Sequence, residues 1–281
     1  MEPHDVAAGP AGDEEDPDRL FSALWAPIGE AAADAARLRP GARVLHVGRD
    51  AGAFAIPAAE RVGPLGGVDA VDTAESSRER GRARAALRGL SSVRFPPADV
   101  LDRPAPPGGY DTVLCGFGVP PCSGVPAGTE RLPGLLRPGG RMAVTVWTRD
   151  ALVPLAEAAR RALAPERPGA ADVLRPGDRL HPLGTPRALR HWLAARPLSF
   201  VDVRHVPLVV PRDPDLLWPL ADLVSGGLLD GLPAAAAKRV RRRFSDRLRA
   251  GGRDVIDASV LVGTGAVPRV APPRRPRGAR P

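Results

Sequence analysis

The stretch from Leu38 to Trp147 repeats one pattern, in which a short apolar segment is followed by a loop and then by a helical segment. The segments GARVLHVG, GVDAVD and VRFPPADV predict three strands: Arg43–Val47, one ending at Asp72 and one ending near Asp99. YDTVLCGFG and LRPGGRMAVTVW predict two more, with a Pro-Gly-Gly turn before the last. Such alternation is typical of a parallel sheet with helices on both faces. A sheet of this kind, with acids at its strand ends, predicts a domain that binds a nucleotide cofactor.

The rest of the chain predicts helices and two further strands. The expected helices are Glu30–Leu38, which follows an interruption at Pro27, Ala151–Leu163, and a segment that opens at Thr185-Pro186 and ends near Ala195. Pro57 is expected in the first turn of the helix that ends at Gly63-Pro64, where its missing N–H costs little. The expected strands are Phe200–Val210 and Asp254–Gly265, and residues 213–250 between them form a helical insertion.

The second half of the insertion contains an apolar seam with the spacing of a helix. Val240, Phe244 and Leu248 follow one another at four-residue intervals, and seven Lys and Arg side chains surround them. A basic amphipathic helix of this kind is typical of a packed helix with a solvated rim, and less often of a surface for anions or membranes. The packed seam is the favoured interpretation.

Both ends of the chain differ in composition from the body. Residues 1–18 are acidic and rich in Gly, Pro and Asp, and residues 268–281 are rich in Pro and Arg. Neither segment offers much apolar surface to bury, so both are expected to be disordered and to flank one domain over residues 19–267. No stretch is apolar and long enough to span a membrane, and the acidic N-terminus is unlike a signal peptide. Two cysteines, Cys115 and Cys122, do not make a disulfide framework, which favours the cytoplasm.

The net charge of +8 does not by itself indicate a nucleic-acid partner. Five of the arginines stand in the last thirteen residues, and without them the charge falls from +8 to +3. The chain holds one lysine and many Ala, Pro, Gly and Arg residues, a skew typical of GC-rich coding. Aromatic residues, which stack on bases, make up 4% of the chain. We therefore expect no nucleic-acid partner.

Glycines and acids lie where a doubly wound sheet binds its ligand, beyond the carboxyl ends of its strands. Gly48 and Gly52 flank the turn after the first strand, where the backbone can approach a ligand closely. Asp72 ends the second strand, at the position from which a carboxylate accepts both hydroxyls of a ribose. Asp99 ends the third and can accept a hydrogen bond from an adenine amino group. Their order on consecutive strands predicts one nucleoside site.

The segments that carry these residues resemble a known family, the class I S-adenosylmethionine-dependent methyltransferases, and within it the ubiquinone/menaquinone-biosynthesis C-methyltransferases and similar small-molecule enzymes. The similarity runs from about Trp25 to Gly265, through LRPGARVLHVG, AAERVGPLGGVDAVD, LLRPGGRMAVTVW and IDASVLVGTG. It implies a seven-stranded sheet whose last two strands form an antiparallel hairpin. It also implies S-adenosylmethionine as cofactor, and methyl transfer to a small-molecule acceptor.

The resemblance also implies roles for individual residues. Gly48 and Gly52 would contact the methionine part of the cofactor, Asp72 its ribose and Asp99 its adenine. The segment Cys115–Phe117, after the fourth strand, would line the reacting centre.

Two residues of the cofactor loop depart from the family pattern. His46 stands where the family usually has an acid that holds the cofactor's ammonium group, and Asp50 stands where it usually has a glycine. One hypothesis is that Asp50 supplies the acid from a new position. A second is that the loop no longer binds cofactor and the fold persists as a non-catalytic partner of another protein. A third makes His46 a strand-end residue without a role.

Other assignments remain general at this point. His181, His191 and His205 lack metal-ligand spacing, so no metal is expected, and no residue is assigned as a catalytic base. Trp147 and Trp218 are candidates for a substrate wall, although core positions are commoner. A nicotinamide-dependent oxidoreductase is an alternative because of Asp72, but the G-x-G-x-x-G fingerprint is absent. A nucleic-acid methyltransferase ranks last. Residues 120–130 and the insertion are expected to select the acceptor, and a homo-oligomer is possible.

Overall fold

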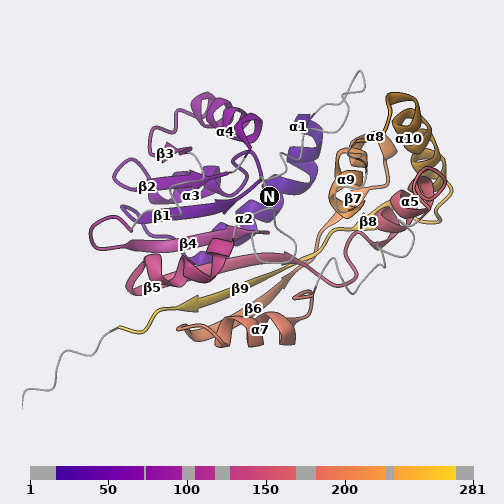
Figure 1. The fold of residues 1–281 in the computed structure, drawn as a ribbon. Coiled ribbons are helices and arrows are strands. Elements are labelled where there is room, and N and C mark those ends of the chain that lie inside the picture. The colour runs from indigo at the N-terminus through magenta and orange to yellow at the C-terminus, as the bar shows by residue number, and fades with distance from the viewer. Residues whose placement is uncertain are drawn as a thin grey trace, which may run out of the picture.

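The computed structural model describes residues 17–72, 74–96, 105–117, 127–168, 182–225, 229 and 231–269. Its centre is a seven-stranded sheet in the order β3-β2-β1-β4-β5-β9-β6 (Figure 1). The strands are β1 (Arg43–Gly48), β2 (Gly67–Val71), β3 (Val93–Arg94), β4 (Tyr110–Gly116), β5 (Leu136–Trp147), β6 (Ser199–Val206) and β9 (Val260–Ala266). The first five are parallel, and β9 runs antiparallel to β5 and β6. The predicted Rossmann-like fold is confirmed.

Helices cover both faces of this sheet because its strands alternate between two apolar cores. Val44 of β1 faces a core built with the helices α2 (Ala26–Ala36), α3 (Ala55–Val62) and α4 (Glu75–Leu87). Leu45 faces a second core, which includes Leu132 of the 3-10 helix η3 (Ala127–Leu135) and Leu189 of α7 (Pro186–Ala194). This two-sided burial is what a parallel sheet requires, because its strands are apolar on both faces.

The N-terminal helical segment continues through the proline that was expected to interrupt it. Helix α1 (Pro17–Leu20) begins two residues before the expected domain boundary and leads into a π-helical turn, η1 (Phe21–Trp25), and then α2. Pro27 is the second residue of α2 and directly follows the π-helical turn, where the Ala26 N–H donates to the carbonyl oxygen of Phe21. A π-helical turn accommodates such a change of hydrogen-bond partner without ending the helix. Residues 1–16 and 270–281, expected to be disordered, lie outside the described residues.

The Pro-Gly-Gly segment lies within a strand, so the expectation of a turn before the last parallel strand is corrected. β5 pairs Leu136 with Tyr110 and then Arg141 with Thr112, so residues 137–140 stand opposite the single residue Asp111. Gly139 has a φ of +79°, a conformation that favours glycine. The segment is a bulge that interrupts the ladder and then lets it resume.

The two C-terminal strands are also shorter than the sequence suggested. Instead of continuous strands over 200–210 and 254–265, the chain forms β6 and β9 in the main sheet and then β7 (Val209–Pro211) and β8 (Val255–Asp257) in a separate pair. Pro207 and Ser259 mark the break: Pro207 has no N–H, and the Ser259 hydroxyl accepts a hydrogen bond from the Leu208 N–H at 3.2 Å. The hairpin thus changes direction as it leaves the sheet.

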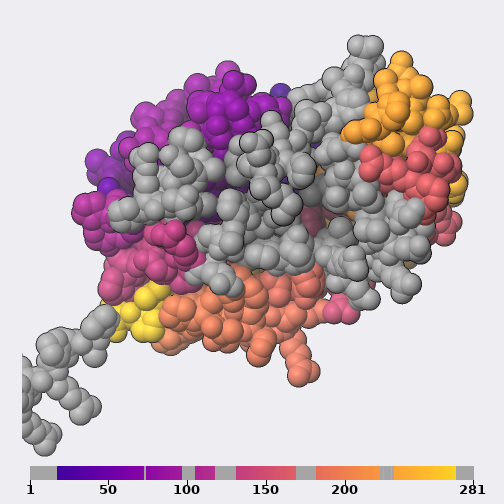
Figure 2. Space-filling view, viewed as in Figure 1, coloured from indigo at the N-terminus to yellow at the C-terminus, as the bar shows by residue number. Residues whose placement is uncertain are grey.

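Helices beyond this break form a lobe at the end of the molecule opposite α4 (Figures 1 and 2). It consists of α5 (Val153–Leu163), α8 (Pro214–Leu217), α9 (Pro219–Ser225) and α10 (Ala234–Arg249), beside β7 and β8. The predicted seam of α10 is buried, with Val240, Phe244 and Leu248 each at most 1% exposed. The packed interpretation of that helix is confirmed. Among the described residues, no helix is long and apolar enough to cross a membrane.

Candidate cofactor and acceptor site

The carboxyl ends of β1, β2 and β4 bring most of the predicted site residues together. Gly48 at the end of β1 pairs with Gly116 at the end of β4, and Asp72 directly follows β2. His46 lies on β1, and Asp50 lies on the loop between β1 and α3. Parallel strands place these ends at one edge, so five positions from three separate segments of the chain form one cluster.

His46 and Asp50 form a buried pair beneath this loop. The His46 Nε2 and Asp50 Oδ2 atoms are 2.9 Å apart, and each side chain is 2% exposed. The distance is that of a hydrogen bond, yet neither atom has an aligned partner among the described residues. The imidazole also stacks on the ring of Phe54, with centroids 5.3 Å apart. A buried carboxylate oxygen without an aligned donor is costly unless a ligand supplies one.

The loop that carries Asp50 is closed by hydrogen bonds of its own. The Gly52 N–H donates to Asp50 Oδ1 at 3.0 Å, and the Ala51 N–H donates to Ser77 Oγ at 3.0 Å. The Ala53 N–H donates to the carbonyl oxygen of Asp50 at 3.1 Å. Three consecutive backbone donors are therefore satisfied within the protein. The side chain of Asp50 shapes this turn in place of the flexibility that a glycine would have provided.

Glycine is required at positions 48 and 52 of the loop for different structural reasons. A Cβ on Gly48 would lie 2.7 Å from the carbonyl oxygen of Gly116 and 2.9 Å from His46 Nε2, so no side chain fits there. Gly52 has a φ of +91°, and a Cβ on it would meet Gly81 of α4 and Ile56 of α3 at 3.2 Å. Gly48 thus lies against the buried His46–Asp50 pair, whereas Gly52 allows a left-handed turn and close helix packing.

Asp72 is buried at the second strand end and is electrostatically linked to the pair. Its Oδ1 accepts from the Ala74 N–H at 2.9 Å, and its backbone carbonyl accepts from the Arg78 guanidinium. Burial raises the pKa of Asp72, against the opposing hydrogen bonds from Ser77 and Ala74. The charge of Asp50 raises that pKa further. This interaction shows that the edge holds two acids in one poorly solvated region.

Of the other predicted positions, one packs in the apolar core and one lies outside the described residues. Cys115 is 1% exposed and belongs to the apolar core shared with η3 and α7, so its side chain packs inside the sheet. Asp99 lies outside the described residues, as does residue 73, which follows Asp72. His181 and Cys122 also fall outside them. Within the described part of the chain, no group of three metal-ligating side chains is present.

Four aromatic rings gather beside the loop in a chain that has few of them. Phe117 stacks on Trp147 with ring centroids 4.5 Å apart. Phe117 and Trp25 pack in a T-shaped arrangement with ring centroids 5.7 Å apart. Phe54 links this group to His46, since its ring lies 6.3 Å from that of Phe117 and stacks on the imidazole. Phe117 has a φ of +54°, which is unfavourable for a bulky residue. The aromatic cluster (Trp25, Phe54, Phe117 and Trp147) thus borders the cofactor loop.

Sequence reasoning found part of this cluster. Phe117 was expected at the reacting centre and Trp147 was a candidate wall, whereas Trp25 and Phe54 were missed as site residues. The scarcity of aromatic residues was the available signal, because the chain has only 11 Phe, Trp and Tyr residues in all. Both candidate tryptophans are core residues of one apolar cluster, where Trp147 packs against Phe117 and Trp218 packs against Phe244 in the lobe.

Comparison with known proteins agrees with this geometry. Residues 44–140 match a family model described as a methyltransferase domain. A nocamycin O-methyltransferase from Saccharothrix syringae is 34% identical over 216 residues, which cover 72% of this chain and 73% of the relative. The chain belongs to the class I S-adenosylmethionine-dependent methyltransferases. A UbiE ubiquinone/menaquinone C-methyltransferase from Ectopseudomonas mendocina is also similar to this methyltransferase, at 31% identity over 40% of the chain and 44% of the relative.

Solved structures show the same fold. A cyclopropane-fatty-acyl-phospholipid synthase-like protein from Lactobacillus casei superposes on the methyltransferase with a TM-score of 0.53 and 17% identity. The match covers 92% of this chain and 95% of that one. The family likeness supports S-adenosylmethionine-dependent methylation of a small-molecule acceptor, as the sequence predicted. None of these likenesses favours a nicotinamide-dependent oxidoreductase.

Proposed function

We propose that this methyltransferase transfers the methyl group of S-adenosylmethionine to an oxygen of a small organic acceptor that carries a flat, apolar ring system. The aromatic cluster beside the cofactor loop carries the proposal: Phe54 and Trp147 are buried in the core, whereas Trp25 and Phe117 are half-buried and leave apolar ring surface on which a flat partner can stack. Oxygen is the favoured atom because the relative that covers most of this chain is named an O-methyltransferase.

Asp50 is proposed to hold the cofactor's ammonium group in place of the acid that His46 replaces. Its Oδ2 atom is buried, lacks an aligned donor and lies against Gly48, where the absence of a Cβ leaves the backbone close to the pair. An ammonium group would supply the missing donor and a compensating charge. His46 contributes by orienting the carboxylate, since the two side chains are 2.9 Å apart.

The remaining cofactor contacts are proposed from strand ends. Asp72 is proposed to accept the ribose hydroxyls, because it directly follows β2, and Asp99 is proposed to accept the adenine amino group. Gly48 keeps the loop backbone close to the ligand, and Gly52 sets the turn that follows it. The bound cofactor supplies an activated methyl group, and the residues of this chain supply position and orientation for an in-line displacement.

Calorimetric titration with S-adenosylmethionine tests the relocated acid. We expect the parent protein to bind at micromolar concentration and the Asp50→Gly variant to bind at least about tenfold more weakly, because it loses a charged partner of the ammonium group. The His46→Asp/Asp50→Gly double variant, which restores the family pattern, should bind about as well as the parent. Asp34→Asn, on the exposed side of α2, is the matched control.

Other outcomes are equally informative. Tighter binding by Asp50→Gly than by the parent would contradict the relocated acid. No binding by the parent, with recovery in the double variant, would identify a loop that has lost its cofactor and a protein that acts by association. If the parent binds, transfer of radiolabelled methyl groups to a panel of phenols and matched non-aromatic alcohols tests the acceptor class.

A further inference from the structure

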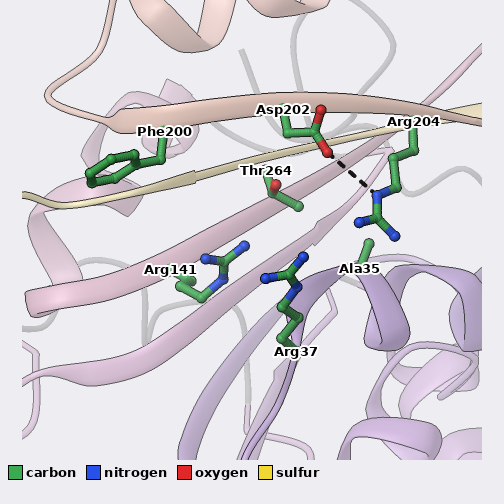
Figure 3. Close-up of a pocket in the computed structure, with 7 residues that line it drawn as sticks. All are labelled: Ala35, Arg37, Arg141, Phe200, Asp202, Arg204 and Thr264. Atoms are coloured by element: carbon green, nitrogen blue, oxygen red, sulfur yellow. Dashed lines mark hydrogen bonds and ion pairs between the residues drawn. The ribbon is translucent and has the colours of Figure 1, made fainter.

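A cavity lies away from the cofactor edge, between the end of α2 and the antiparallel strands of the sheet (Figure 3). Its volume is about 150 Å³, and its polar lining comes from Arg37, Arg141, Arg204, Asp202 and Thr264. Ala35 and Phe200 complete it. In Figure 3 the guanidinium groups of Arg37 and Arg141 lie next to one another and extend toward Thr264. We refer to this cavity as the arginine pocket.

The arginine pocket contains more positive charge than its surroundings neutralise. Asp202 pairs with Arg204 at 3.4 Å, and both side chains are 56% exposed. Arg37 and Arg141 have no acidic partner among the described residues, and the buried Nε of Arg141 has no hydrogen-bond acceptor there. Burial lowers the pKa of Arg141, and the nearby charges of Arg37, Arg39 and Arg204 lower it further. An anion in the cavity would remove this repulsion.

The backbone around the pocket is held in unfavourable conformations. Arg37, which ends α2, has a φ of +54°, and Phe200 has a φ of +56° at a register shift between β6 and β9. Phe200 is also 88% exposed, although it is a large apolar residue. Left-handed conformations are uncommon for such residues and cluster at ligand sites. Here they direct an arginine into the cavity and leave an apolar ring at its rim.

The charge at a helix end accounts for the position of one arginine of the pocket but not for the positions of the other two. The C-terminal end of α2 carries a partial negative charge, which favours a cation such as Arg37. Arg141 and Arg204 lie on β5 and β6, and no helix end accounts for them. Arg141 is also six residues before Trp147 on β5, or roughly 20 Å along the strand from the cofactor edge. The pocket is therefore separate from the methyl-transfer site.

We propose that the arginine pocket binds a phosphate group, either as inorganic phosphate or as the monoester of a small molecule whose organic part leaves over Phe200. A guanidinium binds phosphate through two parallel N–H donors, and converging guanidiniums suit its several acceptor oxygens. The hydroxyl of Thr264 and the free Nε–H of Arg141 provide further donors. The inference is independent of the cofactor and acceptor.

Titration of the whole chain with sodium phosphate, at ionic strength held constant with sodium chloride, tests the proposal. We expect saturable binding by calorimetry and a rise in the unfolding temperature that depends on phosphate concentration. Arg141→Gln should weaken binding at least about tenfold, because it removes the central charged donor. Arg190→Gln, which removes one exposed charge on α7, should bind like the parent.

A second ligand and a second variant distinguish the source of the phosphate and guard against misfolding. Phenyl phosphate should bind more tightly than inorganic phosphate if an ester is the ligand, and Phe200→Asn should remove that advantage while it suits the positive φ. Equal affinities of the two ligands would assign the site to inorganic phosphate. Unsaturable binding, or binding unchanged in both Arg141→Gln and Arg37→Gln, would overturn the proposal.

Discussion

The cofactor edge and the helical lobe handle buried and ionised groups in opposite ways. At the cofactor edge, Asp50 Oδ2 lacks an aligned donor and burial raises the pKa of Asp72. In the lobe, Glu166 accepts two hydrogen bonds from Arg239, at 3.0 and 2.7 Å, and one from Arg243 at 2.9 Å. These bonds lower the pKa of Glu166 to about 2. Polar groups at the cofactor edge therefore lack hydrogen-bond or charge partners in the free protein, whereas the charged groups of the lobe are paired.

The contrast shows how the stability of the fold is divided between the two regions. Groups that are incomplete in the free protein reduce its stability and gain a partner only when ligand binds. The lobe holds the apolar seam of α10 against α5 and Trp218, and its ion pairs lie at the rim of that core. We therefore expect changes in the lobe to alter stability and changes at the edge to alter binding.

Replacing Leu248 with alanine should produce the largest loss of stability. Its side chain is 1% exposed in the seam of α10, so truncation leaves a cavity and costs about 2–5 kcal/mol. Leu87→Ala is the matched control, because this leucine also lies on a helix but is 86% exposed. Urea denaturation measures both. A comparable loss in the two variants, or a weakened cofactor affinity in Leu248→Ala at temperatures where it is folded, would show that the lobe and the cofactor edge do not have separate roles.

Gly48→Ala should have the largest effect on cofactor binding. The new Cβ would lie 2.7 Å from the carbonyl oxygen of Gly116, so the loop must move away from the end of β4. We expect an affinity loss of about 100-fold, or roughly 2.7 kcal/mol, with some loss of stability from overpacking. Gly67→Ala is the control, because a Cβ there meets nothing within 4 Å. Equal cofactor affinities in the two variants would show that the loop is not the binding element.

Asp72→Asn should weaken cofactor binding while it stabilises the free protein. Loss of the charged ribose acceptor predicts about a tenfold lower affinity. Because the pKa of Asp72 is raised in the folded state, its ionisation costs stability at neutral pH. The gain from Asn should therefore be present at pH 7 and vanish as the pH falls below the ordinary value of 3.8.

Calorimetry and thermal unfolding at several pH values measure both effects of this substitution. Asp69→Asn serves as the control on the same strand, since Asp69 already has partners in Tyr110 and Arg94. It should lose stability and retain cofactor affinity. A stabilised Asp72→Asn variant with parental affinity would separate Asp72 from the cofactor.

Most of the sheet could be predicted because its strands follow a local pattern. Apolar runs such as that of β1, together with the helix end at Gly63 and the helix start at Thr185, define element ends without long-range information. The break in the C-terminal hairpin was not predicted, because it depends on the cross-strand hydrogen bond from the Leu208 N–H to Ser259 and on the missing N–H of Pro207. The bulge at residues 137–140 was likewise missed, since it depends on the register with β4.

The site was predictable where residues act at strand ends and not where they act by packing. Gly48 and Asp72 follow from topology alone, and their order along the chain located the edge. The contact of His46 with Asp50 needs the turn geometry, in which Asp50 bonds to the Gly52 N–H. The aromatic cluster joins four separate elements, and the arginine pocket joins a helix end to antiparallel strands. Contacts of this kind, between elements far apart in the sequence, cannot be predicted from a local sequence pattern.

The ion pairs at the lobe should give the smallest effect and the clearest pH dependence. Arg239 and Arg243 lower the pKa of Glu166 from its ordinary 4.5 to about 2. Their contribution is therefore present above pH 4.5 and is lost as the pH falls toward 2. Glu166→Gln should lower the unfolding temperature at pH 7 by less than Leu248→Ala, because these groups are near solvent and screened. The difference from the parent should shrink below pH 4.5.

Glu60→Gln is the matched control: its partner Arg88 is 3.8 Å away, so this substitution should change the unfolding temperature little at any pH. A Glu166→Gln effect that is independent of pH would show that the charge is not what stabilises the lobe.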